Sequence, residues 1–167
     1  AQNNMDKAEE AYRKAVALAP KDSRDRLTLA EFYAGAGMKD KSIEALQAIL
    51  KDDPTNDIAR SSMASIYMSQ KDFQKAAGKA DEILSKNPND PNGLLLKGRI
   101  LLAQKNFPEA TKQFQLAVAA DFESPIAHYL LGAAYLQAGD KVRAEAEMTE
   151  STKRAGRFGQ PYMALAG

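Results

Sequence analysis

Hydrophobic positions along this chain recur with the period of an α-helix. In the first clear stretch, Leu29, Ala30 and Tyr33 lie on one helical face. The glycine-rich stretch 35–37 then interrupts the pattern. A second helical face follows it: Ser42, Leu46, Ile49 and Leu50. Because Asp53-Pro54 closes this second stretch, the pattern predicts a pair of helices joined by a tight turn.

The same helix–turn–helix pattern repeats every 34 residues. Four kinds of position keep this interval. They are a proline that ends the pair (Pro20, Pro54, Pro88), a small residue early in the second helix (Ala8, Ser42, Ala76, Ala110, Ala144), an aromatic or leucine residue (Tyr33, Tyr67, Leu101, Tyr135) and a small residue within the first helix (Ala30, Ala64, Gly98, Gly132). The proline series continues to Phe122 and Gly156, which also fall at predicted helix ends. Four series in a single register indicate a tandem helical repeat.

The small residues of the first helices have a packing reason. They fall where the two helices of a pair cross, so the axes can approach toward the short end of the usual range of about 8–10 Å. Large side chains are expected to fill the space beside them: Tyr12, Leu46, Phe114 and Met148. Ala80 takes this large position in one pair, which predicts looser packing there.

The later turns are predicted at three dipeptides in the same register: Lys71-Asp72, Lys105-Asn106 and Gly139-Asp140. Asn106 and Asp140 are side chains of the type that caps a helix N-terminus, and Pro108 suits a first helical turn. We therefore expect second helices to begin directly after these turns.

This pattern resembles the tetratricopeptide repeat family, which uses a 34-residue helix–turn–helix with small, aromatic, alanine and proline residues at these places. The resemblance implies an all-α fold, a right-handed α-solenoid of antiparallel helix pairs. It divides the chain into residues 1–22 as the second helix of a truncated repeat, 23–56, 57–90, 91–124 and 125–158 as complete units, and 159–167, with Tyr162 and Leu165, as the start of a further first helix. We expect a piece of a longer bacterial scaffold protein, whose unpartnered ends associate with another copy of the chain.

Composition narrows the range of functions. With 44% hydrophobic residues among 167, the chain can bury a core, and a net charge of +1 provides no field that attracts nucleic acid. A short basic tail, Lys153, Arg154 and Arg157, is the one local exception. The absence of cysteine excludes disulfides and thiolate metal sites.

No residue pattern supports catalysis, so we expect no enzyme activity, no cofactor and no metal. His128 is the single histidine, and we interpret it as a partly buried packing residue, with a pH-sensitive role as the alternative. The acidic pairs Glu9-Glu10 and Asp52-Asp53 are interpreted as solvation and helix capping. Lys97, where a leucine is usual in the family, is expected to lay its stem along apolar surface.

The resemblance also implies where a partner binds, because the first helices of successive units line a concave surface. The predicted groove consists of Arg24, Leu27, Glu31 and Ala34, then Ile58, Ser61, Ser65 and Met68, then Asn92, Leu95, Arg99 and Leu102, and finally Ile126, Tyr129, Ala133, Leu136 and Gln137. The Lys and Asn pattern with which some family members hold a peptide's terminal carboxylate is missing. The groove is instead largely neutral, with exposed apolar side chains: Leu27, Met68, Leu95, Leu102, Tyr129 and Leu136.

These features predict a protein-interaction scaffold that binds an amphipathic or apolar polypeptide segment, without nucleic acid or membrane insertion. The alanine-rich helices and the linker from Asn87 to Asp90 are similar to those of bacterial envelope proteins of polysaccharide export or pilus assembly. The absence of cysteine fits the periplasm and the cytoplasm equally well. A regulatory domain of a larger enzyme or signalling protein is the alternative function. For the groove, the alternative is that its apolar side chains simply pack between adjacent first helices.

Replacing both Leu95 and Leu102 by Glu is expected to abolish capture of a partner, because two carboxylates would enter an apolar contact. Affinity capture followed by mass spectrometry measures the loss, and circular dichroism confirms that the variant is folded. Unchanged partners with an intact fold would exclude the predicted groove.

Overall fold

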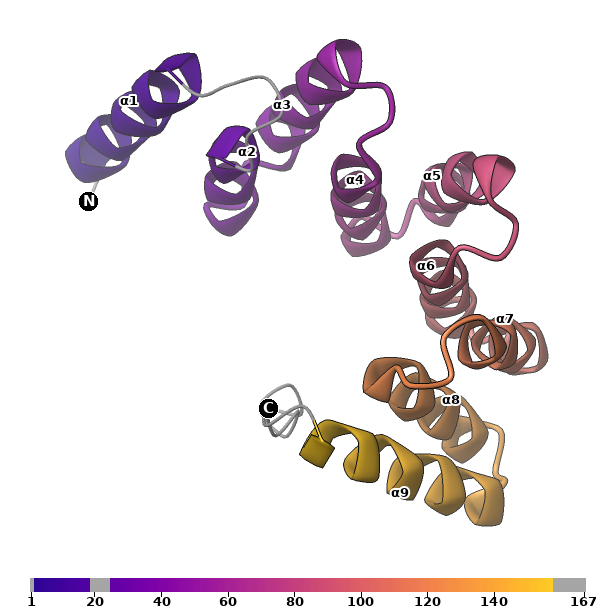
Figure 1. Ribbon diagram of the computed structural model, residues 1–167. Helices are drawn as coiled ribbons and strands as arrows, with labels where there is room; N and C mark the ends of the chain where they lie inside the picture. Colours follow the sequence, from indigo (N-terminus) through magenta and orange to yellow (C-terminus); the bar gives the residue numbers. More distant parts are fainter. Residues whose placement is uncertain (1, 19–24, 158–167) are drawn as a thin grey trace. The chain divides into compact units, whose positions relative to one another are not determined.

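The computed structural model of the chain describes residues 2–18 and 25–157, which contain nine α-helices (Figure 1). The chain divides into two compact units, Ala1–Asp72 and Phe73–Gly167. The first unit holds α1 (Gln2–Leu18), α2 (Asp25–Gly35), α3 (Lys39–Asp52) and α4 (Asp57–Ser69). The second holds α5 (Phe73–Lys86), α6 (Pro91–Ala103), α7 (Phe107–Ala120), α8 (Pro125–Gln137) and α9 (Lys141–Arg157). Three predictions, for Pro20, Arg24 and the segment 159–167, lie outside the described residues.

Within each unit, each helix packs against the next one along the chain. In the first unit the core is formed by one cluster of buried side chains: Leu27, Ala30, Leu46, Ile49, Ala59, Met63 and Ile66. In the second unit, Phe114, Leu131 and Tyr135 belong to a cluster that joins α7, α8 and α9, and Leu94 belongs to a smaller one beside it. No strand occurs in the described ranges, so the predicted all-α fold is confirmed.

Two glycines mark the places where paired helices come closest in the second unit. A Cβ atom on Gly98 would lie 2.5 Å from Cε1 of Phe114, and one on Gly132 would lie 2.9 Å from Cγ of Met148. The prediction that a large side chain fills the space beside each small residue is therefore confirmed for these two helix pairs. In the first unit the corresponding residues, Ala30 and Leu46, share one buried cluster, and the Ser42 hydroxyl adds a 2.7 Å hydrogen bond to the carbonyl of Ala30.

Helix starts are fixed by side-chain caps at a constant interval that the sequence analysis overlooked. Asn56, Asp90 and Ser124, which are 34 residues apart, each accept a hydrogen bond from the backbone N–H three residues later. Of the two predicted caps, Asp140 accepts from the N–H of Arg143 at 3.0 Å, whereas the Asn106 side chain makes no such bond. Pro108 lies in the first turn of α7, as expected.

The four turns inside the helix pairs have one geometry. At each, a residue with positive φ follows the first helix: Gly37, Lys71, Lys105 and Gly139. In the third turn, the N–H of Lys105 bonds to the Leu102 carbonyl and that of Asn106 to the Leu101 carbonyl, which is the Schellman arrangement. The other three turns repeat both bonds. Two lysines therefore hold a left-handed conformation that suits glycine.

Gly98→Ala is expected to destabilise the chain by about 1–2 kcal/mol, because overpacking a core costs about 1–3 kcal/mol and better helix propensity returns up to about 1 kcal/mol. The matched control is Gly78→Ala, since Gly78 lies within α5 and no atom is within 4 Å of its added Cβ. That variant is expected to be more stable by up to about 1 kcal/mol. Urea denaturation measures both. Equal effects of the two substitutions would contradict the close approach at Gly98.

Lys105→Gly is expected to stabilise the chain by about 0.5–1 kcal/mol, because relief of about 1–2 kcal/mol of left-handed strain exceeds the added flexibility of the unfolded chain. Gly139→Ala, at the equivalent turn, is expected to destabilise it by a similar amount, since φ there is 85°. Thermal unfolding of the two variants checks the prediction. A lower melting temperature for Lys105→Gly would show that the lysine is not strained.

Candidate functional site

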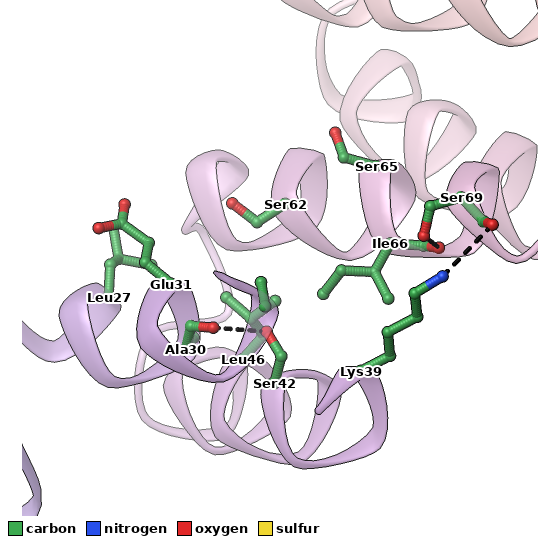
Figure 2. A pocket seen from close by; sticks show the side chains of 11 residues that line it. Leu27, Ala30, Glu31, Lys39, Ser42, Leu46, Ser62, Ser65, Ile66 and Ser69 are labelled. Atoms are coloured by element: carbon green, nitrogen blue, oxygen red, sulfur yellow. Dashed lines mark hydrogen bonds between the residues drawn. The ribbon is translucent and has the colours of Figure 1, made fainter. Parts of the chain in front are cut away.

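A cavity of about 350 Å³ lies between α2, α3 and α4, within the first unit (Figure 2). It is lined by the first helices of two successive repeats, α2 and α4, and by the second helix of the earlier repeat, α3. Its walls contain eleven residues: Leu27, Ala30, Glu31, Ala34, Lys39, Ser42, Leu46, Ser62, Ser65, Ile66 and Ser69.

The floor of the cavity is buried and mainly apolar. Ala30 and Leu46 belong to the core of the unit, and Ser42 between them is equally buried. The Ser42 hydroxyl is already bonded to the Ala30 carbonyl, so it presents no unsatisfied donor to the cavity (Figure 2). The floor therefore suits an apolar group.

The α4 wall is less polar than its three serines suggest. The Ser65 hydroxyl donates to the Ser61 carbonyl at 3.1 Å, and the Ser69 hydroxyl donates to the Ile66 carbonyl at 2.7 Å. These hydroxyls are bonded to their own helix. The Ile66 side chain points from α4 toward α3 and adds apolar surface (Figure 2).

Two opposite charges stand at the rim of the cavity. Lys39, at the start of α3, reaches toward α4 and donates to the Ser69 carbonyl at 3.4 Å (Figure 2). Glu31 is exposed on α2. The balance leaves the site without net charge, which agrees with the neutral groove expected from the sequence.

The predicted groove residues of the first unit are only partly gathered here. Glu31, Ala34 and Ser65 line the cavity, whereas Ile58 is 56% exposed elsewhere on α4. Ser61 and Met68 are partly buried and do not line it. Leu27 does line it, but the expectation that Leu27 is exposed is wrong, because it is 6% exposed and packs in the core.

Seven lining residues lie outside the predicted groove. Three of them, Ala30, Ser42 and Leu46, were predicted as packing positions, and four were not predicted at all: Lys39, Ser62, Ile66 and Ser69. The three on α4 follow helical spacing, but their stripe is rotated by one residue from the predicted one. The 34-residue repeat shows which residues occupy equivalent positions in the helices. It does not show which side of a helix faces the cavity. Lys39 lies at the first position of α3, which the predicted stripe of first-helix residues did not include.

In the second unit the residues predicted to line the groove differ in their burial. Leu95 and Leu102 are half-buried and pack against the core clusters. For these two, the alternative of packing between helices explains their burial, so the double Glu substitution would also disturb the core. More exposed side chains remain on α8, where Tyr129 is 40% and Leu136 48% exposed. The others are exposed (Asn92, Arg99, Gln137) or partly buried (Ile126, Ala133).

His128 has partners that the sequence did not reveal. It is fully buried rather than partly buried, and its Nδ1 lies 2.6 Å from Oε2 of Glu147. Its Nε2 lies 3.0 Å from the carbonyl oxygen of Phe122. In the corresponding position two repeats earlier, Arg60 donates to the Pro54 carbonyl. These side chains hold the loop before the first helix.

The predicted basic tail is not a free patch. Arg154 is buried, donates from Nε to the Phe122 carbonyl at 2.8 Å and pairs with Glu150. Lys153 also pairs with Glu150, and the two cations hold the pKa of that carboxyl at about 2. Of the three predicted basic residues, only Lys153 is therefore an exposed cation whose side chain the structure describes.

The acidic pairs do more than solvate the surface. Asp53 does cap the following turn, accepting from the Thr55 N–H at 3.0 Å. Asp52, however, forms an ion pair with Arg26 at 2.7 Å, which links the end of α3 to the start of α2. Glu9 bonds to groups on both α2 and α3. Lys97 forms an ion pair that the sequence did not predict, with its amine 2.7 Å from Asp81.

Among residues 2–18 and 25–157, no three His, Cys, Asp or Glu side chains are placed to hold a metal ion. None of the helices that the structure describes is long and apolar enough to cross a lipid bilayer.

Comparison with known proteins supports the helical repeat. The sequence profile of the tetratricopeptide repeat matches residues 1–66 and 67–132. No curated protein sequence matches the chain. A crystal structure of MamA is 18% identical over 94% of this chain and 92% of its own, with a TM-score of 0.67. MamA from Desulfovibrio magneticus RS-1 is 16% identical over 95% and 90%, with a TM-score of 0.68.

A thermophilic tetratricopeptide repeat protein from Thermus thermophilus is 16% identical over 93% of this chain and 86% of its own, with a TM-score of 0.75. At these identities the similarities concern the fold alone. They confirm the predicted α-solenoid class, built of antiparallel helix pairs.

Proposed function

We propose, because the chain belongs to the tetratricopeptide repeat family, that it is a non-catalytic scaffold that binds a segment of another polypeptide. The observation that carries this proposal is the cavity between α2, α3 and α4. It lies on the first-helix side of the repeat, has a preformed apolar floor, and is not filled by side chains of the chain itself.

The chemistry of the cavity suits an apolar side chain carried on a peptide backbone. Its volume of about 350 Å³ is at the lower end of the range of about 300–1,000 Å³ that is usual for binding pockets. The buried floor offers van der Waals contact to one apolar side chain. Glu31 and Lys39 at the rim offer an acceptor and a donor for the polar backbone beside it.

An amphipathic or apolar segment meets both requirements, since it presents an apolar side chain flanked by polar groups. The exposed Tyr129 and Leu136 on α8 provide a second apolar surface on the predicted groove helices. More specifically, we propose that the partner belongs to a bacterial envelope assembly of the polysaccharide-export or pilus type. The alanine-rich helices and the linker from Asn87 to Asp90 are similar to those of proteins in such assemblies.

Ala34→Trp is expected to weaken peptide binding at least about tenfold, because the indole would occupy the mouth of the cavity and exclude an anchoring side chain. Peptides are first selected from a displayed random library against the unmodified chain. Their dissociation constants are then measured by fluorescence anisotropy with each variant.

The matched control is Ala48→Trp, which adds the same side chain at an exposed position of α3 outside the cavity. We expect this control to bind the selected peptides as the unmodified chain does. Selected peptides that lack apolar residues, or that bind the Ala34 variant unchanged, would exclude this cavity as the binding site.

A further inference from the structure

One carboxylate in the first unit fastens three helices together. Glu9, on α1, accepts hydrogen bonds from the Tyr33 hydroxyl at 2.8 Å and from the Lys41 amine at 3.2 Å. It also accepts one from Nε of Arg13 at 3.0 Å. The Lys41 amine lies over the Tyr33 ring, 5.3 Å from its centroid. A tyrosine hydroxyl and a stacked cation thus bind a carboxylate from the preceding helix.

The repeat carries most of this arrangement into the second unit, but without the carboxylate. Three 34-residue intervals further along, the tyrosine is Tyr135 and the stacked cation is Arg143. The place of Arg13 is taken by Gln115, and that of Glu9 by Thr111. In the two intervening repeats the Glu9 position holds Ile43 and Ala77, whose apolar side chains form no hydrogen bonds.

Tyr135, like Tyr33, has a cation over its ring. The Arg143 guanidinium lies over the Tyr135 ring, 4.5 Å from its centroid. The Gln115 side-chain amide donates to the Tyr135 hydroxyl at 2.7 Å, so the hydroxyl proton is still available for donation. The Thr111 hydroxyl oxygen is buried and has no hydrogen-bond partner among the described residues.

These groups line an open cavity of about 740 Å³ in the second unit. Lys112 and Lys141 also line it, and both are exposed. The one carboxylate in its wall is Asp140, which is occupied by the N–H of Arg143 and by Nε of the same residue. Two further cations thus line the cavity beside the Arg143–Asp140 ion pair.

We propose that this cavity, beside Thr111, Tyr135 and Arg143, is a binding site for a carboxylate supplied from outside the chain. The Tyr135 hydroxyl donates to its oxygens, and Arg143 donates from its terminal nitrogens. Lys112 and Lys141 balance its charge. The site shares no residue with the cavity between α2, α3 and α4, so it stands independently of the proposed scaffold function.

The first unit shows the electrostatic result of this arrangement. The pKa of Glu9 is lowered from its ordinary value, chiefly by the hydrogen bond from Tyr33 and then by those from Lys41 and Arg13. The donors that surround Glu9 therefore favour a charged carboxylate over a neutral one.

The direct test is a titration of the chain with sodium glutarate, followed by NMR of the Gln115 side-chain amide and of the Arg143 Nε–H. Ionic strength is held constant with sodium chloride. We expect saturable shifts of both signals with glutarate and none with chloride alone. Shifts absent with glutarate, or equal with chloride, would overturn the proposal.

Two variants of equal size separate binding from folding. Thr111→Glu supplies the missing carboxylate from within the chain, so it is expected to raise the melting temperature above that of Thr111→Gln and to abolish the glutarate shifts. Thr111→Gln is the size-matched reference for the melting temperature only. If the Glu variant melts no higher than the Gln variant, or still responds to glutarate, the proposed site is wrong.

The source of the carboxylate is distinguished by two further ligands. One is acetyl-Ala-Glu-Ala-amide, which presents an acidic side chain on a peptide, and the other is its glutamine counterpart. Tighter binding of the glutamate peptide than of glutarate assigns the site to a polypeptide, and equal binding assigns it to free organic acids. Binding of the glutamine peptide as tightly as the glutamate peptide would overturn the proposal.

Discussion

The distance between paired helices is the constraint on which the rest of the structure depends. In the second unit it is set by Gly98 and Gly132, whose missing side chains leave space for Phe114 and Met148. Because protein interiors are densely packed, a methyl group added at such a crossing forces the neighbouring side chains or the helix backbones to move. The small residue at this position thus lets successive helix pairs pack with similar geometry, and the cavities form on the surface of the stacked repeats.

Periodic features were therefore the ones that the sequence predicted well. The helix pairs, the close crossings at Gly98 and Gly132 and the all-α class follow from spacing alone. The candidate site was predicted less well, because a position in the repeat does not state how far a helix is rotated. Leu27 was expected at the surface and lies in the core, whereas Ser62 and Ile66 face the cavity.

Long-range polar contacts were the features least accessible to sequence reasoning. His128 with Glu147 and Arg26 with Asp52 join residues far apart in the chain, and neither pair forms a local motif. The hydrogen bond between Glu9 and Tyr33 was not predicted for the same reason. A comparison of equivalent positions in different repeats would have found Glu9 and Thr111 in one slot, because that comparison needs only the register.

The caps at Asn56, Asp90 and Ser124 have a consequence for how the chain is made. Each cap bond closes over three residues, and each Schellman turn over five, so the boundaries of a helix are specified without help from distant parts of the chain. Interactions of such short range form early and quickly. During synthesis, every repeat can define its own ends as it leaves the ribosome, and only the packing between repeats has to wait for its neighbour.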